Sequence, residues 1–344
     1  MKIHLLYEYG SDFVPHGSSY IRLLWPYQHR ALKSLVTVTQ GIELDDMSAD
    51  VYIIERMWRP DINLQKAEET VNKIKRAGKK LVYTLDDNLL DLQFNREGWK
   101  WPSKEQKNVV RLFAKEADGI IVSTEPLKQR FLKLNKNIQV VPNALDERIE
   151  AYNVKKSKNK NLTFGYMGTP SHDEDLMMIL PAIREILRTY EVEFQIVGVL
   201  TQDQVNDHFQ ELNVKLLDTT GNVEYPNFVR WMGRNLNWDF AIAPLDENEF
   251  SICKSDIKML DYGIFGIPSI FSDLSLYREH VVHKENGYLC RNTIDDWMDA
   301  LEYMITKPEE REKMGRNVKE YVLANRTLQT CSMNWYNALV EIIK

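Results

Sequence analysis

The sequence has little cysteine, no long apolar run and no excess of basic residues. Cys253, Cys290 and Cys331 are the only thiols among 344 residues, which argues against a disulfide framework or a cysteine-ligated zinc site. No apolar run approaches the length of about eighteen residues that a membrane span needs. The formal charge of −6 gives no general attraction to nucleic acid. We therefore expect a cytoplasmic protein of a reducing compartment without a nucleic-acid partner.

Short apolar runs alternate with longer segments of helical periodicity in both halves of the chain. This alternation predicts parallel strands joined by helices, which is the α/β class. The runs cover residues 2–9, 49–56, 79–87, 118–125 and 138–144 in the first half, and 161–168, 192–200, 214–218, 238–245 and 267–272 in the second.

A polar, lysine-rich segment at residues 148–160 separates the two halves and predicts a linker. We expect one doubly wound domain over 1–147 and a second over 161–325, followed by a helical segment over 326–344. In open α/β sheets the ligand binds at the carboxyl ends of the strands, so we expect the site in a cleft between the domains.

The segment that begins FSICKSDIKMLDY at Phe250 has the residues of a nucleotide diphosphate site. We expect a helix that begins near Ser255 as its N-cap, with Lys254 and Lys258 on one face near the positive helix end. An anionic ligand fits there, and Asp261, one turn later, can accept hydrogen bonds from ribose hydroxyls. The alternative is that the two lysines form a solvated helix face.

A glycine-containing turn, GTPSHDEDL, follows the apolar run of residues 161–168. Gly165 and Gly168 allow the backbone to approach a ligand closely, although an ordinary strand-to-helix turn explains them equally well. Thr169 in this turn and Tyr262 in the lysine segment complete the candidate donor-binding residues.

Asp86 and Asp87 follow an apolar run, so their side chains are expected at the ligand edge of the first sheet. One of them is a candidate base or hydroxyl ligand, and the alternative is that both cap a helix. No third or fourth ligand has clear spacing from this pair, so no required metal is predicted.

Further candidates for the acceptor side are His16, Gly17, Ser18 and Arg22, in a loop and the helix after it, and Arg56, at the end of another run. The helix that carries Arg22 could also touch an anionic membrane surface where a lipid-linked acceptor resides. The alternative is a plain amphipathic surface helix.

Nearly the whole chain resembles the GT-B glycosyltransferases, within the large retaining group that builds bacterial polysaccharides and glycoconjugates. The resemblance rests on four segments in order, GYMGTPSHDEDL, WDFAIAPL, CKSDIKMLDYGIFGIPSIFSD and YREHVVHKENGYLC. It implies two Rossmann-like domains that face a cleft, with the C-terminal helix over 326–344 packing back on the N-terminal domain. The first domain would bind the acceptor and the second the nucleotide-sugar donor.

The family pattern places two glutamates beside the donor, and this chain has Cys253 and Asp261 at those positions, with Glu249 near the first. The resemblance implies transfer of a hexosyl group from a nucleotide diphosphate sugar to a saccharide, protein-linked or lipid-linked acceptor. Lys254, Lys258 and helix-end amides would stabilise the departing diphosphate, and no cofactor or metal would be needed.

Two other functions are consistent with the same architecture. A nucleotide-sugar epimerase would turn over the donor without an acceptor. A catalytically degenerate transferase-like subunit would bind a nucleotide or glycan and scaffold a partner enzyme.

Overall fold

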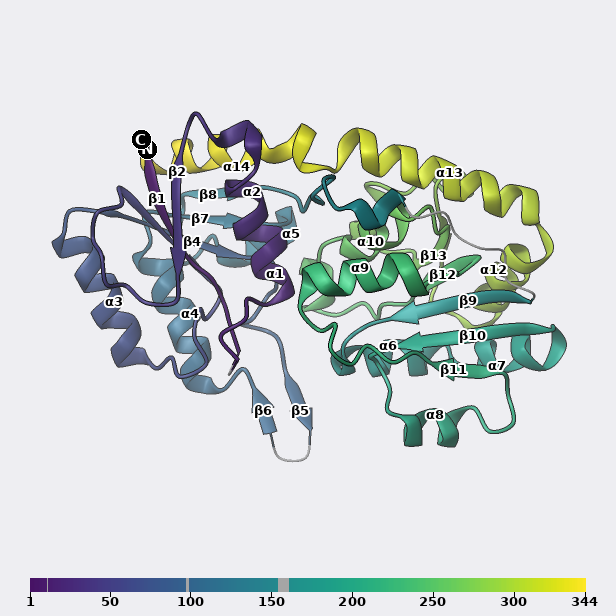
Figure 1. Cartoon of the computed structure of the whole chain (residues 1–344). Coiled ribbons are helices and arrows are strands. Elements are labelled where there is room, and N and C mark those ends of the chain that lie inside the picture. The colour runs from purple at the N-terminus through teal and green to yellow at the C-terminus, as the bar shows by residue number, and fades with distance from the viewer. Residues whose placement is uncertain (11, 97–98, 154–160) are drawn as a thin grey trace. The chain divides into compact units, whose positions relative to one another are not determined.

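The computed structural model describes residues 1–10, 12–96, 99–153 and 161–344. The chain divides into two compact units, each built on its own sheet and each described here by itself (Figure 1). Unit 1 consists of Met1–Glu147, Ile252–Ser255 and Arg326–Lys344, and unit 2 of Arg148–Ser251 and Asp256–Asn325. Of the expected linker, Glu150–Asn153 forms the 3₁₀ helix η3 in unit 2, and 154–160 lie outside the described residues.

Unit 1 contains a six-stranded parallel sheet in the order β2-β1-β3-β4-β7-β8. The strands are β1 (Lys2–Leu6), β2 (Thr37–Gly41), β3 (Val51–Glu55), β4 (Lys80–Leu85), β7 (Gly119–Val122) and β8 (Ile138–Val140), with a separate antiparallel pair β5 (Phe94–Arg96) and β6 (Trp99–Trp101). The helices are α1 (Gly17–Ser19), the π-helix η1 (Tyr20–Leu24), α2 (Trp25–Tyr27), η2 (Arg30–Leu32), α3 (Leu64–Arg76), α4 (Lys104–Glu116), α5 (Glu125–Phe131) and α14 (Leu328–Ile343).

Helices cover both faces of this sheet, and the side chains of β3 show how. Val51 and Ile53 point into a core that they share with Trp335 of α14. Tyr52 and Ile54 point into the opposite core, which they share with α3 and α4. Because both faces are buried, the strands read as continuous apolar runs in the sequence.

Unit 2 contains a second six-stranded parallel sheet in the order β11-β10-β9-β12-β13-β14. The strands are β9 (Leu162–Met167), β10 (Val192–Val197), β11 (Val214–Leu216), β12 (Phe240–Ala243), β13 (Ser269–Ser272) and β14 (Tyr288–Cys290). The helices are η4 (Pro170–His172), α6 (Asp173–Met178), α7 (Leu180–Thr189), α8 (Gln202–His208), α9 (Tyr225–Asn235), α10 (Ile257–Ile264), α11 (Ser275–Arg278), α12 (Ile294–Thr306) and α13 (Pro308–Asn325), and η5 (Ser251–Cys253) lies at the boundary of the units.

The expected fold class is confirmed, since both sheets are parallel and doubly wound and each of the ten apolar runs contains a strand. The expected return of the C-terminal helix is also confirmed, because α14 packs on β7 and β8 in unit 1 (Figure 1). The short edge strands β2 and β14 were not predicted.

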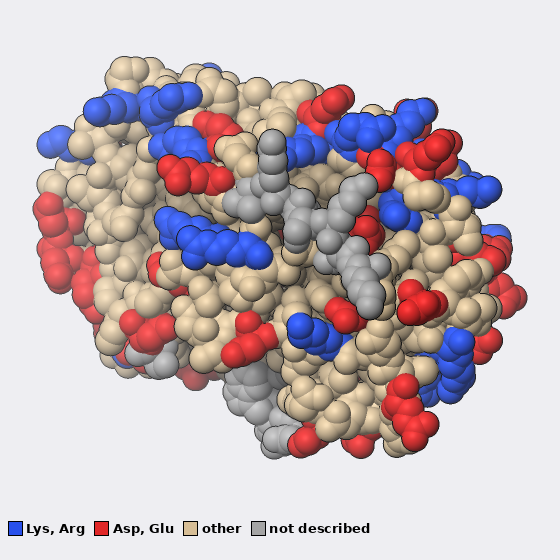
Figure 2. Space-filling view, turned by 45° about the vertical axis from the view of Figure 1, so that its right-hand side comes forward, with Lys and Arg blue, Asp and Glu red and all other residues tan. Residues whose placement is uncertain are grey.

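Charged side chains of both signs are interspersed on the face in Figure 2, and neither sign covers it. Within the described ranges, no helix is both long and apolar enough to cross a lipid bilayer.

Gly165 has a packing role rather than the expected role in ligand approach. It lies within β9 and is buried, and a Cβ atom added there would lie 2.0 Å from Cε2 of Trp238. Trp238 is itself buried and donates a hydrogen bond from Nε1 to Gln195 Oε1 at 2.8 Å. The indole therefore occupies the space in which a side chain at position 165 would lie.

We expect Gly165→Ala to destabilise the protein by about 2–4 kcal/mol, because the methyl group would force a buried indole to move. Thermal unfolding followed by circular dichroism measures the loss. Gly41→Ala is the control, since no atom there lies closer than 3.6 Å to the added Cβ. Equal melting temperatures for the two variants would contradict this packing role.

Candidate active site

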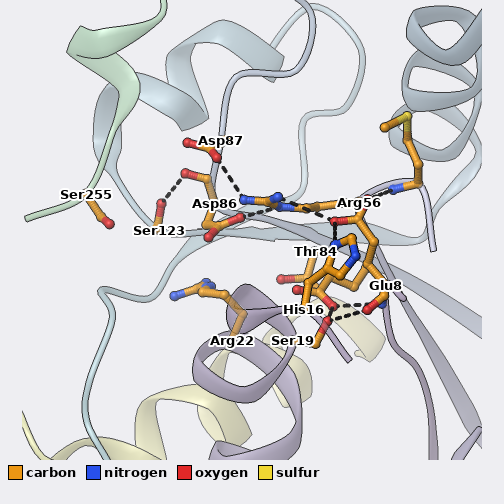
Figure 3. A network of polar contacts seen from close by, with 12 residues as sticks. Glu8, His16, Ser19, Arg22, Arg56, Thr84, Asp86, Asp87, Ser123 and Ser255 are labelled. Carbon is orange, nitrogen blue, oxygen red and sulfur yellow. Dashed lines mark hydrogen bonds and ion pairs between the residues drawn. The ribbon is translucent and has the colours of Figure 1, made fainter. Parts of the chain in front are cut away.

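The polar residues of unit 1 gather at the carboxyl edge of its sheet (Figure 3). Glu8 follows β1, Arg56 follows β3, Asp86 follows β4 and Ser123 follows β7. Parallel strands end at one edge, so side chains far apart in the sequence meet there. The strand order reverses direction between β1 and β3, which is where open α/β sheets bind ligands.

Arg56 joins three of these strand ends through its guanidinium group. Nε donates to Asp86 Oδ1 at 2.7 Å, Nη2 donates to Asp87 Oδ2 at 2.8 Å, and Nη1 lies 3.4 Å from Glu8 Oε2. The Arg56 side chain is only 13% exposed. Three nearby carboxylates, led by Asp86, hold the pKa of Arg56 above its usual value against the opposing effect of burial. The sequence therefore placed Asp86, Asp87 and Arg56 correctly at one edge.

The backbone of Arg56 adopts a conformation that non-glycine residues rarely take, with φ of 45°. Its N–H donates to Thr84 O at 2.9 Å, and its carbonyl oxygen accepts from the Tyr83 hydroxyl at 2.8 Å. These contacts to β4 fix the strained residue so that its side chain points along the edge.

A second cluster surrounds Glu8 and Glu55. Glu55 is fully buried and accepts hydrogen bonds from the Glu8 N–H at 3.0 Å and from the Ser19 hydroxyl. Burial, assisted by the charge of Glu8, raises the pKa of Glu55 to about 7. His16, half exposed, lies 3.4 Å from the Glu8 carboxylate, and this hydrogen bond raises the pKa of His16.

Arg22 is not a surface residue, so its own side chain is not placed to touch a membrane surface or solvent. Its side chain is 1% exposed, and its segment consists of short α, π and α turns rather than one helix. Nη1 donates to Val141 O at 2.5 Å and to Asn143 Oδ1 at 2.9 Å. The guanidinium lies over the Trp335 ring at 5.6 Å, and the indole N–H donates to Arg22 O at 3.0 Å.

The neighbouring residues Gly17 and Ser18 open the short helix α1, and both are partly buried. The Ser18 hydroxyl is buried without a hydrogen-bond partner in the described part of the chain. No contact in the structure distinguishes Gly17 as a ligand residue, so its assignment stays a prediction.

In unit 2 the order of the strands reverses between β9 and β12, and Tyr262 of α10 bridges these two strands. Its hydroxyl accepts from Met167 N at 3.1 Å and donates to Ile242 O at 3.5 Å. Tyr262 is 1% exposed, so it joins the ends of β9 and β12 from within the protein interior. Gly168 and the exposed Thr169 follow β9 directly, so they lie at the edge where the sequence predicted them.

The first turn of α10 carries Lys258, and the next turn carries Asp261. Lys258 Nζ lies 5.6 Å from the centroid of the Tyr166 ring in β9. Asp261 is buried and accepts a hydrogen bond from the Tyr225 hydroxyl at 2.8 Å. Burial raises the pKa of Asp261 to about 6, although the Tyr225 hydrogen bond and the charge of Lys258 oppose the shift.

The expectation that Lys254 and Lys258 share one helix face is wrong. The helix begins at Ile257 with Asp256 as its N-cap residue, so Lys254 precedes it. Ser255 does not cap the helix, because its hydroxyl accepts a hydrogen bond from Asn143 Nδ2 at 2.9 Å within unit 1. Lys254 and Ser255 belong to unit 1, whereas Lys258 belongs to unit 2.

Cys253, at the position of the family's first glutamate, packs into the core of unit 1 and is 3% exposed. Its carbonyl oxygen accepts from the Thr124 hydroxyl at 2.9 Å, and its sulfur lies 3.7 Å from Asn88 Nδ2. A buried thiol in this position acts as a small apolar side chain. Glu249 lies nearby in the sequence and is exposed.

Sequence reasoning missed several residues of these edges. Glu8 lies at the end of an apolar run, and the same kind of position had identified Asp86. For Tyr225 the sequence offers no comparable signal. His172, in the turn after β9, is another missed residue, and its Nδ1 lies 2.7 Å from Asp175 Oδ2. Within the described ranges, no group of three or more His, Cys, Asp or Glu side chains is placed to hold a metal ion.

Comparisons with known proteins agree with this architecture. Residues 147–321, just over half of the chain, match the family model described as glycosyl transferases group 1. A search of curated proteins gave no match.

Several solved structures are similar in fold. HepE of Anabaena, in complex with UDP-glucose, is 16% identical with a TM-score of 0.66, and the match covers 99% of both chains. TarM of S. aureus, in complex with Fondaparinux, alpha-GlcNAc-glycerol and UDP, is 17% identical with a TM-score of 0.59, over 84% of this chain and 55% of that chain. Sucrose-phosphate synthase of Thermosynechococcus elongatus is 12% identical with a TM-score of 0.63, over 86% and 74%. This chain therefore spans little more than half of the length of TarM.

We expect the stability of the protein to fall between about pH 4.5 and pH 7 through Glu55. Its pKa is about 7 in the folded protein against 4.5 normally, so the folded state binds the proton more tightly. The stabilisation is complete below the lower value and is lost as pH rises through the higher one. Glu55→Gln mimics the protonated acid, so its free energy of unfolding should not fall in this way. From pH 5 to pH 8 the difference in free energy of unfolding between variant and parent should therefore shift by about 1–3 kcal/mol in favour of the variant.

Urea unfolding of the parent and the variant at the two pH values measures this difference. Glu185→Gln, at a half-exposed position on α7, is the control and should follow the parent at both pH values. Parallel pH profiles for the parent and Glu55→Gln would contradict the assignment.

Proposed function

Because the chain belongs to the group 1 glycosyltransferases, we propose that it transfers a hexosyl group from a nucleotide diphosphate sugar to a hydroxyl group of a saccharide or glycoconjugate acceptor. The transfer proceeds with retention at the anomeric carbon and without a metal ion. Unit 2 binds the donor, and unit 1 binds the acceptor.

The observation that carries the proposal is the placement of α10 at the strand reversal of unit 2. Lys258 offers an ammonium group at the β9 edge, where it can neutralise a diphosphate. Asp261, one turn later, offers a carboxylate that can accept hydrogen bonds from ribose hydroxyls. The Gly168 N–H donates to Val197 O at 3.0 Å, so it is Thr169, the next residue after it, that offers a backbone N–H group at the same edge.

The chemistry depends on stabilising the leaving group. The bond between the anomeric carbon and the phosphate oxygen breaks, and the anomeric carbon forms a bond to the acceptor oxygen. The acceptor proton passes to the departing diphosphate. Lys258 stabilises the charge that develops on that diphosphate. Cys253 is buried in the core of unit 1, so the mechanism uses no protein nucleophile at that position.

A uridine nucleotide is the first donor class to test. HepE of Anabaena is known in complex with UDP-glucose, and TarM of S. aureus in complex with UDP. The acceptor is a free saccharide or a protein-linked or lipid-linked glycan, and contact with a membrane surface would follow from a lipid-linked one.

We expect UDP to raise the melting temperature of the protein by several degrees, because a ligand at a hundred times its Kd adds about 2.7 kcal/mol of stability. GDP, dTDP and CMP serve as comparisons, and EDTA should leave the UDP shift unchanged. Lys258→Ala should raise the Kd for UDP about tenfold or more, since it removes a charge-assisted contact. Lys215→Ala, at an exposed position on β11, is the matched control. The absence of a shift with any nucleotide would overturn the proposal.

We expect UDP affinity to fall as pH drops through about 6, because only the ionised form of Asp261 accepts both ribose hydrogen bonds. Tyr225→Phe removes a hydrogen bond that favours the carboxylate, so the pKa of Asp261 rises further and the loss of affinity moves to higher pH. Calorimetric titration with UDP between pH 5 and pH 8 measures the shift. An unchanged profile in Tyr225→Phe would remove Asp261 from the nucleotide site.

A further inference from the structure

The two adjacent carboxylates of unit 1 differ in their surroundings. Both are bound by Arg56, but in Figure 3 Asp86 lies between Arg22 and the Asp87 carboxylate. Burial lowers the pKa of Arg22 to about 10, and Asp86 is the charged group that opposes this shift most strongly. Asp86 is therefore the carboxylate whose charge acts most strongly on Arg22.

Asp86 is fixed by hydrogen bonds to its Oδ1 atom and its backbone carbonyl, which leaves its Oδ2 atom for a ligand. Its Oδ1 accepts from Arg56 Nε at 2.7 Å, and its backbone carbonyl oxygen accepts from the Ser123 hydroxyl at 3.1 Å. Among the described residues no group hydrogen-bonds its Oδ2 atom, and its side chain is 15% exposed. The second carboxylate oxygen is thus pre-positioned at the strand edge and reachable from solvent.

Two of the three guanidinium nitrogens of Arg22 make no hydrogen bond with the described residues. Nη1 makes both hydrogen bonds of its guanidinium, while Nε and Nη2 are buried and have no hydrogen-bond partner in the described part of the chain. No described carboxylate forms an ion pair with Arg22. A buried guanidinium with unused donors is costly unless another polar group meets it.

A sugar hydroxyl suits this pair of groups, because it donates one hydrogen bond and accepts others. It can donate to Asp86 Oδ2 and accept from Arg22, which satisfies both. A phosphate or carboxylate fits less well, since it would face the negative charges of Asp86, Asp87 and Glu8.

We propose that Asp86 and Arg22 together bind the hydroxyl group of an uncharged acceptor saccharide, and that Arg56 is the positioning residue that fixes Asp86. This inference rests on the proposed function. Asp86 orients the oxygen that attacks the anomeric carbon, and water in the same place is the smallest acceptor. The role of Asp87 in this arrangement is to hold Arg56.

The test uses the full chain and measures UDP release from a panel of UDP-hexoses, with water as the acceptor and with added methyl α-glucoside. Asp86→Asn should lower kcat about a hundredfold and Arg22→Lys about tenfold. Arg56→Lys should lower kcat about tenfold with the donor KM unchanged, and Arg56→Met should lower it further. In all these variants the Kd for UDP should stay within twofold of the parent.

The pair of partly buried Arg59 and exposed Asp61 provides matched controls, because Arg59 Nε also donates to a carboxylate oxygen, at 2.6 Å. Arg59→Lys and Asp61→Asn should keep the parent kcat, and Asp87→Asn should lose much less than Asp86→Asn. If Arg22→Lys does not fold, the kcat of Asp86→Asn and its Kd for UDP decide the test.

The inference is overturned if Asp86→Asn turns over donor like its controls, or if it loses UDP affinity in parallel with kcat. A parent protein that neither binds nor turns over any UDP-hexose overturns the proposed function, and the inference falls with it. An acidic acceptor such as methyl glucuronide that outperforms methyl α-glucoside tenfold would overturn the uncharged acceptor class.

Discussion

The Arg56 guanidinium is the contact on which the polar edge of unit 1 depends. A parallel sheet brings the ends of β1, β3 and β4 to one edge, and this places Glu8, Asp86 and Asp87 close together. Three carboxylates at such short range repel one another unless a cation lies among them. The planar, three-pronged guanidinium meets one carboxylate with each nitrogen, which an ammonium group cannot reproduce.

Much of the fold was predictable because strands buried on both faces leave continuous apolar runs. The edge strands β8 and β11 still lie in apolar runs and were predicted, whereas the edge strands β2, with mostly exposed or half-exposed residues, and β14 were missed. The start of α10 was misplaced for a different reason. Ser255 and Asp256 are both good N-cap residues, and a hydrogen bond from Asn143, 112 residues away, engages the serine instead.

The candidate site was predictable where it consists of strand ends, as for Asp86 and Arg56. It was not predictable where a distant residue determines the environment. Arg22 looked like part of a surface helix, but it is buried because Trp335, 313 residues later in the chain, packs on it. Cys253 occupies the position of the family's first glutamate, yet its segment belongs to the core of unit 1. Neither the burial of Arg22 nor the location of Cys253 in a core can be read from the sequence next to it.

The discontinuity of unit 1 has a consequence for biosynthesis. One of the two cores of its sheet contains five buried apolar residues of α14, which are Leu328, Trp335, Ala338, Leu339 and Ile342. The ribosome makes these residues almost 200 positions after Glu147, which is a delay of about 10–40 s at about 5–20 residues per second. Throughout that interval one apolar face of the nascent sheet lacks the part of its cover that α14 supplies. Unit 1 therefore completes its folding only after unit 2 has been synthesised, although it comes first in the gene.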